Sequence, residues 1–493
     1  MRANDSLFIL ISSLDRRELI AVNRALLKNN ASGKYRRIFR SIRSIGRAGK
    51  YVEDDIIKKS GCRNKNAFSV SKNYLYGIIV NILINLNTTA SSDGMIKMQI
   101  SFIDLMYKRT LYSKAYEQLK KTKRKAYISD NFLRLVEIIR LERNLVIELI
   151  TPAKKTGVIL SLFEEEKTIL AKINNISEYR CIEYQIRETI SDTVSTGKKY
   201  NHKLLGFRKR SVLSSQKKAL SFAALASFYN TNSIISMYCD DIKGTYRFRK
   251  KLVEHIETRK DVKFENPTNY IVSLYNLIES CYEMLLPEEM ITYIYKLRLF
   301  AERVKIPENS KLLSDLGCSK QELKYSLIKP DIDASEKVSK ILFAYLGEYK
   351  GKISGGEESE CLYLIAVSDF LTKSYEDAVI NLNRIISYEK VNNEALNVNV
   401  KTLNIISHFE LRNVELVIYL VNSLTRSLSS IKLPGEFQTV LSKFLKGLSL
   451  VNTDSELKFL IDTNRKAIAE YFSKNNDQIM NNAIKGWLND KFK

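Results

Sequence analysis

The chain has few of the residues that interrupt helices. Its 493 residues include 6 prolines and 18 glycines, far below the roughly 5% and 7% of average proteins. Strand-like alternation of apolar and polar residues is almost absent, whereas helical spacing recurs along most of the chain. We therefore expect an all-α protein built from long helices. The apolar fraction of 45% is ordinary for a folded chain and argues against wholesale disorder.

Motifs of known chemistry are missing as well. The six cysteines stand tens of residues apart, with no C-x-x-C pair and no histidine at metal-ligand spacing. The three histidines, His202, His255 and His408, have no flanking acid or nucleophile motif. No G-x-x-x-x-G-K-[ST] loop occurs, and no G-x-G-x-x-G follows a strand. We expect no enzymatic activity, no cofactor and no metal, and reduced thiols in a cytoplasmic protein.

The apolar runs are too short to predict a membrane helix. The opening SLFILISSL is apolar for about eight residues and then meets DRRE, without the small-residue cleavage site of a secretory leader. The longest other run, Tyr76 to Leu86, is about half of the ~20 residues that a spanning helix needs. We expect no membrane insertion.

Charge is abundant and unevenly placed. The formal net charge is +24, and it is concentrated in residues 1–130, at about +16, and in residues 198–260, at about +11. Such an asymmetry predicts a surface for a polyanion. The alternative is that these lysine-rich helices are merely solvated. The acidic triplet Glu164 to Glu166 is predicted to be a solvated helix start.

The stretch LYSKAYEQLKKTKRKAY, Leu111 to Tyr127, shows how such a basic helix is organised. Small and apolar residues recur at helical spacing and form one narrow stripe, namely Leu111, Ala115, Leu119, Thr122 and Ala126. Lysines and one arginine crowd the rest of its surface. The candidate polyanion contacts in this helix are Lys120, Lys121 and Arg124.

The same stretch has an echo near the C-terminus. A Tyr-x-x-Ala-x-x-x-Leu pattern begins at Tyr112 and again at Tyr375, each time after an apolar helix and a short turn. The small alanine lets a neighbouring helix approach closely, and the aromatic residue fills the gap at the bend. The residues predicted to carry this repeat packing are Tyr112, Ala115, Leu119, Ala366, Tyr375, Ala378 and Leu382.

This pattern resembles tetratricopeptide-like (TPR-like) repeats, in which helical hairpins stack side by side and bury their apolar faces against one another. The resemblance implies an α-solenoid that binds a protein or peptide on its concave face. The chain departs from the repeat pattern at Asp369, where an aromatic residue is usual, and at Ile385, where alanine is usual.

The overall layout, with LDRRELIAVNRALL, VSKNYLYGIIVNIL and FLRLVEIIRLER in this order, looks like that of uncharacterised helical proteins of similar size from Bacteroidota. That likeness implies a helical-repeat build and no particular activity.

Helices and loops predict three parts. Residues 1–90 form a basic helical N-terminal unit, residues 95–350 form degenerate hairpin repeats, and residues 357–493 form C-terminal TPR-like repeats. The connections are a loop from Asn87 to Met95 and a flexible link from Gly351 to Glu360. Prolines are expected at the starts of successive helices, at Pro267, Pro287, Pro307 and Pro330.

Residues 54–77 have the spacing of a DNA-reading helix-turn-helix, with the turn at Gly61. Its small packing core is predicted to contain Ile57, Cys62, Ala67 and Val70. Its candidate DNA contacts are Arg63, Lys65 and Lys72. A simple hairpin within the N-terminal unit is the alternative interpretation.

A second group of candidate contacts lies between residues 206 and 255. GFRKR and KGTYRFRKK place aromatic residues among basic ones, a combination that contacts phosphates and stacks unpaired bases. The candidates are Arg208, Lys209, Arg210, Arg247, Arg249 and Lys250. A solvated face is again the alternative.

We therefore predict an all-α protein, an α-solenoid of stacked TPR-like hairpins with a basic helical N-terminal unit. It should act as a non-enzymatic scaffold or adaptor for a protein or peptide partner, with basic surfaces that contact RNA or a ribonucleoprotein. The alternative is a DNA-binding transcriptional regulator with an N-terminal helix-turn-helix and a C-terminal TPR-like sensor domain.

Overall fold

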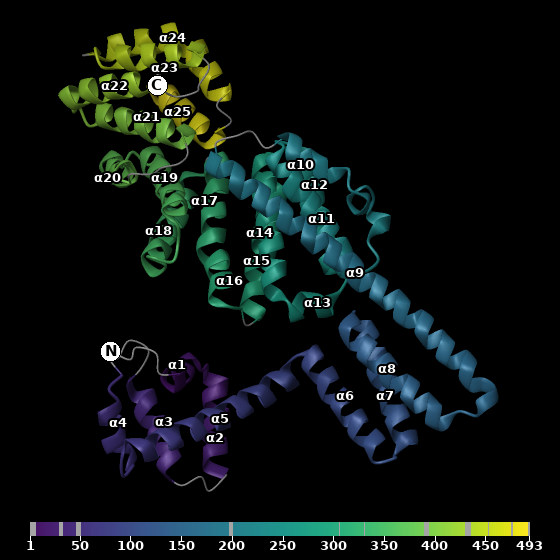
Figure 1. Cartoon of the computed structure of the whole chain (residues 1–493). Helices are drawn as coiled ribbons and strands as arrows, with labels where there is room; N and C mark the ends of the chain where they lie inside the picture. The colour runs from purple at the N-terminus through teal and green to yellow at the C-terminus, as the bar shows by residue number, and fades with distance from the viewer. Residues whose placement is uncertain are drawn as a thin grey trace. The chain divides into compact units, whose positions relative to one another are not determined.

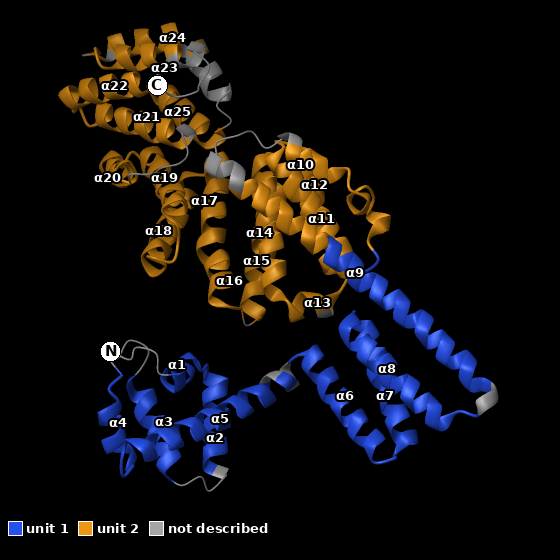
Figure 2. Ribbon diagram, in the orientation of Figure 1, with its two compact units in different colours: residues 1–178, 220–222 blue, residues 179–219, 223–493 orange. Residues whose placement is uncertain are grey.

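The computed structural model describes residues 6–28, 33–45, 51–196, 201–304, 306–329, 331–388, 394–428, 435–451, 453–474 and 477–491. All regular elements in these ranges are helices, and no strand occurs among them (Figure 1). The all-α class is therefore confirmed. The chain divides into two compact units, Met1–Glu178 with Leu220–Phe222 and Tyr179–Ala219 with Ala223–Lys493 (Figure 2). The boundary falls inside one long helix, α9 (Pro152–Thr196).

The first five helices of unit 1 surround a core of their own. They are α1 (Ser6–Ser13), α2 (Arg16–Lys28), α3 (Gly33–Ile45), α4 (Glu53–Ser60) and α5 (Lys65–Ala90). Each helix contributes side chains that are almost fully buried, among them Leu7, Val22, Phe39, Ile56 and Phe68. These five helices can thus bury an apolar core without help from the rest of the chain.

One segment of the described chain, Lys65–Leu86 of α5, is long and apolar enough to cross a membrane by length and composition alone. A single helix of this kind is weak evidence for a membrane span, because core helices share its composition. Phe68, Leu75 and Ile79 of this segment are fully buried in the core of the first five helices. Packing within the protein accounts for this part of its apolar character.

The rest of unit 1 consists of α6 (Ser92–Lys108), α7 (Tyr112–Ile128), α8 (Phe132–Leu149) and the first part of α9. α7 packs against both α6 and α8. The stripe predicted on α7 is buried from Ala115 to Ala126, whereas Leu111, just ahead of the helix, is 45% exposed. Helical spacing therefore identified the correct face of α7.

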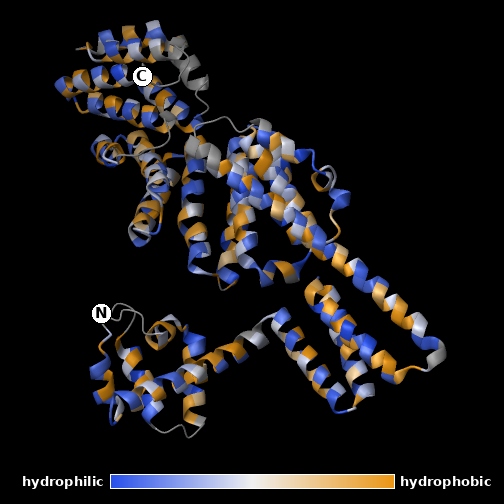
Figure 3. Cartoon of the chain, in the orientation of Figure 1, coloured by the Kyte–Doolittle hydropathy of each residue, from blue (hydrophilic) through white to orange (hydrophobic). Residues whose placement is uncertain are grey.

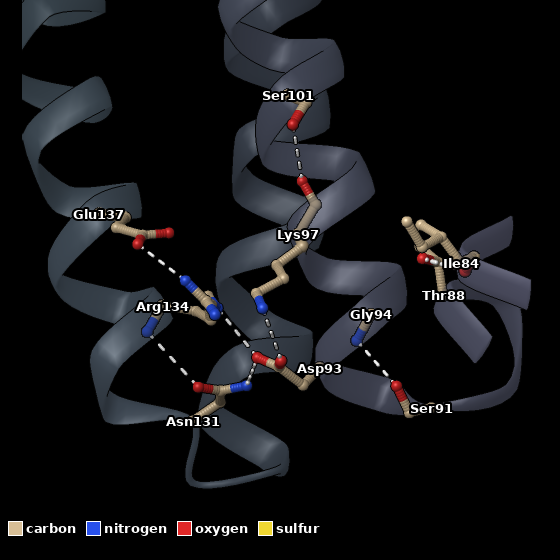
Figure 4. Close-up of polar contacts among 10 residues, drawn as sticks. All are labelled: Ile84, Thr88, Ser91, Asp93, Gly94, Lys97, Ser101, Asn131, Arg134 and Glu137. Carbon is tan, nitrogen blue, oxygen red and sulfur yellow. Dashed lines mark hydrogen bonds and ion pairs between the residues drawn. The ribbon is translucent and has the colours of Figure 1, made fainter. Parts of the chain in front are cut away.

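The loop predicted from Asn87 to Met95 is absent, because α5 continues to Ala90 and α6 begins at Ser92. Ser91 alone separates the two helices, and its hydroxyl accepts a hydrogen bond from the Gly94 amide at 3.0 Å (Figure 4). A Cβ at position 94 would lie 2.5 Å from the Thr88 carbonyl oxygen, so the corner requires glycine there.

Asp93 ties the start of α6 to the start of α8. Its carboxylate accepts hydrogen bonds from Asn131 Nδ2 and Arg134 Nε, both at 2.9 Å (Figure 4). The bonds from Arg134 and Asn131 hold the pKa of Asp93 below its usual value. Polar contacts thus fix the ends of helices whose middles are held by apolar packing.

Unit 2 contains the end of α9 and the remaining helices. Its first elements are α10 (Asn201–Arg208), two short 3₁₀ turns (Ser211–Leu213 and Gln216–Lys218), α11 (Phe222–Tyr238), α12 (Ile242–Glu257), α13 (Lys260–Glu265), α14 (Pro267–Glu283) and α15 (Pro287–Arg303). They are followed by α16 (Glu308–Leu312), a π-helical turn (Leu313–Gly317), α17 (Cys318–Ile328), α18 (Ile332–Glu348), α19 (Gly355–Leu371) and α20 (Tyr375–Ile386). The last helices are α21 (Glu394–Glu410), α22 (Val414–Leu428), α23 (Gly435–Leu448), α24 (Asp454–Lys474) and α25 (Gln478–Asp490).

Prolines stand where helices begin, as predicted. Pro267 and Pro287 open α14 and α15, and Pro307 precedes the first residue of α16. Pro330 lies outside the described residues.

Six hairpin turns, two in unit 1 and four in unit 2, share one geometry. In each, three residues connect two helices, and the middle one has a left-handed backbone (φ 50–62°), namely Thr110, Asp130, Asp240, Leu285, Lys373 and Arg412. The next amide reaches back five residues to a carbonyl of the preceding helix, as in Leu111 N to Met106 O at 3.0 Å. None of the six is glycine, so a count of glycines does not reveal these turns.

In unit 2, α12, α14, α17, α19 and α21 form a row in which each helix touches the next. Three further helices alternate with the row along the chain. α15 packs against α17, α18 against α19, and α20 against α21. Hydrophilic and hydrophobic residues are interleaved along these helices, as burial of only some faces requires (Figure 3). One apolar core extends from Leu316 to Leu488. It crosses the link predicted from Gly351 to Glu360, where only a short turn separates α18 from α19.

Candidate functional site

A four-residue turn, residues 61–64, joins α4 to α5 where the sequence predicts a helix-turn-helix. Gly61 closes α4 with a left-handed backbone (φ 72°), and the Asn64 side chain caps α5 by accepting from the Ala67 amide at 2.8 Å. α4 packs along α3, but α4 and α5 are not packed side by side.

The core beneath this turn differs from the predicted one. Phe68, Ser71 and Leu75 face inward, whereas Val70, predicted to lie in the core, is 71% exposed. The other predicted core residues are partly buried, namely Ile57, Cys62 and Ala67. Because neighbouring positions on a helix differ by about 100°, burial of Phe68 and Ser71 turns Val70 outward. The exposed face of the first turns of α5 consists of Lys65, Asn66, Ser69, Val70, Asn73 and Tyr74.

The three cations predicted to contact DNA here differ in accessibility. Arg63 is exposed in the turn. Lys65 is also exposed, and its Nζ lies 3.0 Å from Asp54 in a pair that is open to solvent on both sides. Lys72 is mostly buried, with its Nζ 3.9 Å from Glu53 and 5.7 Å from the centre of the Phe68 ring. Arg63 and Lys65 are therefore the two that can reach a ligand.

The sequence patterns did not single out a row of arginines on α3. The row consists of Arg36, Arg37, Arg40 and Arg43. All but Arg36 are exposed, and within the described residues none of the four side chains takes part in an ion pair or hydrogen bond. The opposite side of α3 is buried through Ile38, Phe39 and Ile42. Arginines three and four residues apart opposite an apolar stripe are the signal that would have identified them.

The arginine row extends to the turn between α4 and α5. A Cβ at Gly61 would lie 3.2 Å from Arg37 Nη2, so this guanidinium rests beside the turn between α4 and α5. The four arginines together with Arg63 and Lys65 form what we call the α3–α5 surface. Within the described residues, Lys65 alone among these six cations has an ion pair, with Asp54.

The basic helix α7 keeps its predicted candidates at the surface. Lys120, Lys121 and Arg124 are exposed, and Lys120 Nζ lies 4.9 Å from the centre of the Tyr116 ring. Lys123 differs, because its Nζ is held between Glu142 at 2.5 Å and Glu165 at 2.7 Å. Three of the cations of α7 are thus exposed to solvent, whereas Lys123 joins α7 to α8 and α9.

The acidic triplet on α9 is not a solvated helix start. Glu165 binds Lys123 in the middle of α9, and Glu166 is buried beside Arg143 at 2.6 Å. The hydrogen bond from Arg143 lowers the pKa of Glu166. These carboxylates pair with cations of α7 and α8, which a single-helix pattern does not reveal.

Part of the second basic group in unit 2 is engaged inside the protein. Arg249, predicted to face a polyanion, is only 9% exposed and donates to the Asn276 carbonyl at 2.8 Å and to Ser280 Oγ at 2.9 Å. Burial lowers the pKa of Arg249. Lys250 donates to Glu289 at 2.9 Å. Both side chains therefore connect α12 to α14 and α15.

The remaining candidates of this group differ in how exposed their side chains are. Arg208 is partly buried and donates to Ser236 Oγ at 2.6 Å. Lys209, Arg210 and Arg247 are exposed. The guanidinium carbon of Arg210 lies 4.9 Å from the Phe207 ring centre, and that of Arg247 lies 4.9 Å from Phe248.

The repeat-packing candidates lie at helix contacts. Tyr112 and Tyr375 begin α7 and α20, and their rings lie 5.4 Å from Tyr107 and 5.5 Å from Phe370, across the hairpin bends. The small and large positions are fully buried, namely Ala115, Leu119, Ala366, Ala378 and Leu382.

No group of three or more His, Cys, Asp or Glu side chains within the described ranges is arranged to hold a metal ion. The described residues offer a set of exposed cations on α3 and at the turn before α5 in unit 1, and a row of packed helices in unit 2. No family model, no curated protein and no solved structure matches this chain.

Proposed function

We propose that this protein is a non-enzymatic, DNA-binding adaptor of the cytoplasm. Its α3–α5 surface holds duplex DNA, and the hairpin row of unit 2 holds a protein or peptide. The observation that carries the first part is the arginine row on α3, which has no ion pair within the described residues and extends to the turn before α5. Arginines whose charge is not cancelled internally release counterions when they bind phosphates, and this release drives association.

Duplex DNA suits this surface better than RNA. A helix with its side chains is about 10–12 Å wide, close to the ~12 Å width of the DNA major groove. The first turns of α5 carry Lys65, Asn66 and Asn73 at exposed positions. These groups can read base edges while the arginines of α3 contact phosphates. The major groove of A-form RNA is too narrow for a helix.

The protein-binding part rests on the packing order in unit 2. A row of helices in mutual contact, with alternate helices behind it, is the arrangement expected of a TPR-like α-solenoid. The repeated left-handed turns support the same interpretation. On this view the row α14–α17–α19–α21 is the concave face.

Contact with RNA or a ribonucleoprotein is the second candidate function. It is favoured by Arg210 and Arg247, which are exposed and already lie over aromatic rings that unpaired bases would also use.

Fluorescence anisotropy with labelled duplex DNA, single-stranded DNA and double-stranded RNA tests the proposal. The test variant is Arg37→Ala, Arg40→Ala, Arg43→Ala. The matched control is Lys209→Ala, Arg210→Ala, Arg247→Ala, which removes the same charge from exposed positions in unit 2. We expect the test variant to bind duplex DNA about tenfold or more weakly, and the control to bind within about threefold of the unmodified protein. Equal losses in both variants would mean that net charge alone drives binding.

A further inference from the structure

The last helix, α25, packs against helices that are far away in the sequence. Besides its neighbour α24, it touches α17 and α19. The other close helix pairs of unit 2 join elements that follow one another at short range along the chain. α25 buries one broad apolar face, which consists of Ile479, Met480, Ala483, Ile484, Trp487 and Leu488. Trp487 is the single tryptophan of the protein.

Polar contacts at the start, middle and end of α25 hold it in this position. At its start, Asp477 Oδ2 accepts hydrogen bonds from Tyr363 at 3.1 Å and from Asn399 Nδ2 at 2.8 Å. In its middle, Asn482 Nδ2 donates to the carbonyl oxygens of Leu327 at 3.1 Å and Ile328 at 2.9 Å.

At its end, Glu410 accepts from Trp487 Nε1 and from Lys491 Nζ, both at 2.7 Å. The partners at the start of α25 thus lie on α19 and α21, those in its middle on α17, and the one at its end on α21. These three helices are successive members of the row.

These partners form a receptor for a helix. The Leu327 and Ile328 carbonyls belong to the last turn of α17, where the intrahelical bonds have run out, so they need donors from elsewhere. Glu410 receives an indole N–H, which is the polar handle of an otherwise apolar anchor. None of these contacts depends on α25 being covalently joined to the row.

The fit of α25 is incomplete. Asn481 is 4% exposed, and its Oδ1 accepts no hydrogen bond within the described part of the chain. A buried acceptor without a donor weakens the seating of the helix that carries it. A competing helix that satisfies this position would have an advantage over α25.

We propose that the row α17–α19–α21 is the partner-binding surface of unit 2 and that α25 occupies it as an intramolecular competitor. The partner is an amphipathic helix with an acidic residue before its first turn and an indole about ten positions later. This inference rests on the proposed protein-binding function and specifies its surface and ligand. Because the tethered α25 is present at high effective concentration, the partner binds only the fraction of molecules in which α25 has left.

A labelled peptide of residues 477–491 is the probe for this exchange. We compare the unmodified full chain with the variant Asn482→Ala, Trp487→Ala, which weakens the resident helix and leaves the row unchanged. The control variant is Lys485→Ala, Asn489→Ala, at exposed positions of α25. We expect the peptide to bind the weakened variant at least tenfold more tightly than the unmodified chain or the control. A peptide carrying Trp487→Ala should not bind.

Absence of peptide binding to a weakened variant that still unfolds cooperatively would overturn the inference, because α25 would then be a fixed part of the core. Hydrogen exchange on the unmodified chain covers the case in which the variant fails to fold. We expect amides of α25 to exchange faster than those of α19, and equal rates would contradict an independent opening. If the peptide binds but no protein of a cell extract competes with it, the proposed binding of a cellular partner is contradicted, whereas the displacement of α25 is not.

Discussion

Two basic helices, α3 in unit 1 and α12 in unit 2, look alike in sequence and differ in how the fold uses their cations. Arg37, Arg40 and Arg43 of α3 are exposed and have no acidic partner in the described chain. On α12, Arg249 and Lys250 instead lie against α14 and α15 and bind a carbonyl, a serine and a glutamate. The number of cations in a helix therefore does not indicate how many are available to a ligand.

What decides availability is the chemistry of the neighbouring helices. The neighbours of α3 contribute apolar side chains to the shared core and a glycine turn beside Arg37. In the first turn of α4, Asp54 and Glu53 pair with Lys65 and Lys72 of α5. The neighbours of α12, α14 and α15, contribute hydrogen-bond acceptors that its cations reach. A polyanion surface requires both a row of cations and the absence of acceptors behind it.

The largest expected effect contrasts one arginine from each helix. Arg249→Met leaves the Asn276 carbonyl and Ser280 without their buried donor, so we expect the free energy of unfolding to fall by about 2–4 kcal/mol. Arg40→Met removes an exposed side chain without a partner and should change it by less than about 0.5 kcal/mol. Urea denaturation measures both. Equal effects would show that the two arginines do not differ as described.

A second test concerns Glu360, which pairs with two lysines of the row in unit 2. Lys320 is 5% exposed, and its Nζ lies 3.1 Å from Glu360, which also binds Lys324 at 2.6 Å. Burial alone would raise the pKa of Glu360, but Lys324 and Lys320 outweigh it and lower the pKa to about 2.

Because the folded pKa of Glu360 is depressed, its stabilisation is complete above the unfolded pKa and is lost as the pH falls through the folded value. The Glu360 side chain is 37% exposed, so we expect a loss of about 1–2 kcal/mol between pH 5 and pH 2, after a discount for solvent screening. Thermal unfolding of Glu360→Gln across this range should lack that part of the pH dependence. A variant with the unchanged profile would assign the acid sensitivity to other groups.

The smallest expected effect concerns an acid of unit 2 that has no cation. Burial raises the pKa of Asp369 to about 6, although the hydrogen bond from Asn381 Nδ2 at 3.0 Å opposes the shift. A raised acid pKa means that the folded state loses stability as the pH rises from about 4 to 6. Asp369→Asn should therefore raise the stability by about 1 kcal/mol at pH 7.5 and by nothing at pH 4. A stabilisation that is the same at both pH values would exclude a charge effect.

The sequence predicted helices and their buried faces where the periodicity is local. Burial of Ala115 and Leu119 on α7 follows from spacing along one helix. The start of α6 was missed because Ser91 and Gly94, which are typical loop residues, build a one-residue corner. The left-handed residues of the hairpin turns could not be predicted from the sequence, for the opposite reason. Residues such as Leu285 and Lys373 occupy left-handed positions that usually hold glycine.

The candidate site was harder to predict because availability is a property of pairs of helices. Arg249 and Arg247 are two residues apart in one basic run, yet only Arg249 faces the acceptors on α14. Val70 was assigned to the wrong face because its neighbours Phe68 and Ser71 determine the rotation of α5. The arginines of α3 carry a readable pattern, but only the structure shows that Arg37 adjoins the turn before α5.

The salt dependence of duplex DNA binding tests the α3–α5 surface most directly. We would measure the slope of log Kobs against log [NaCl] for the unmodified protein and for Arg37→Ala, Arg40→Ala, Arg43→Ala. Each lost phosphate contact reduces the slope by about 0.9, so the variant should be shallower by about 2–3. Identical slopes for the two proteins would show that these arginines do not contact the phosphates, and would contradict the account.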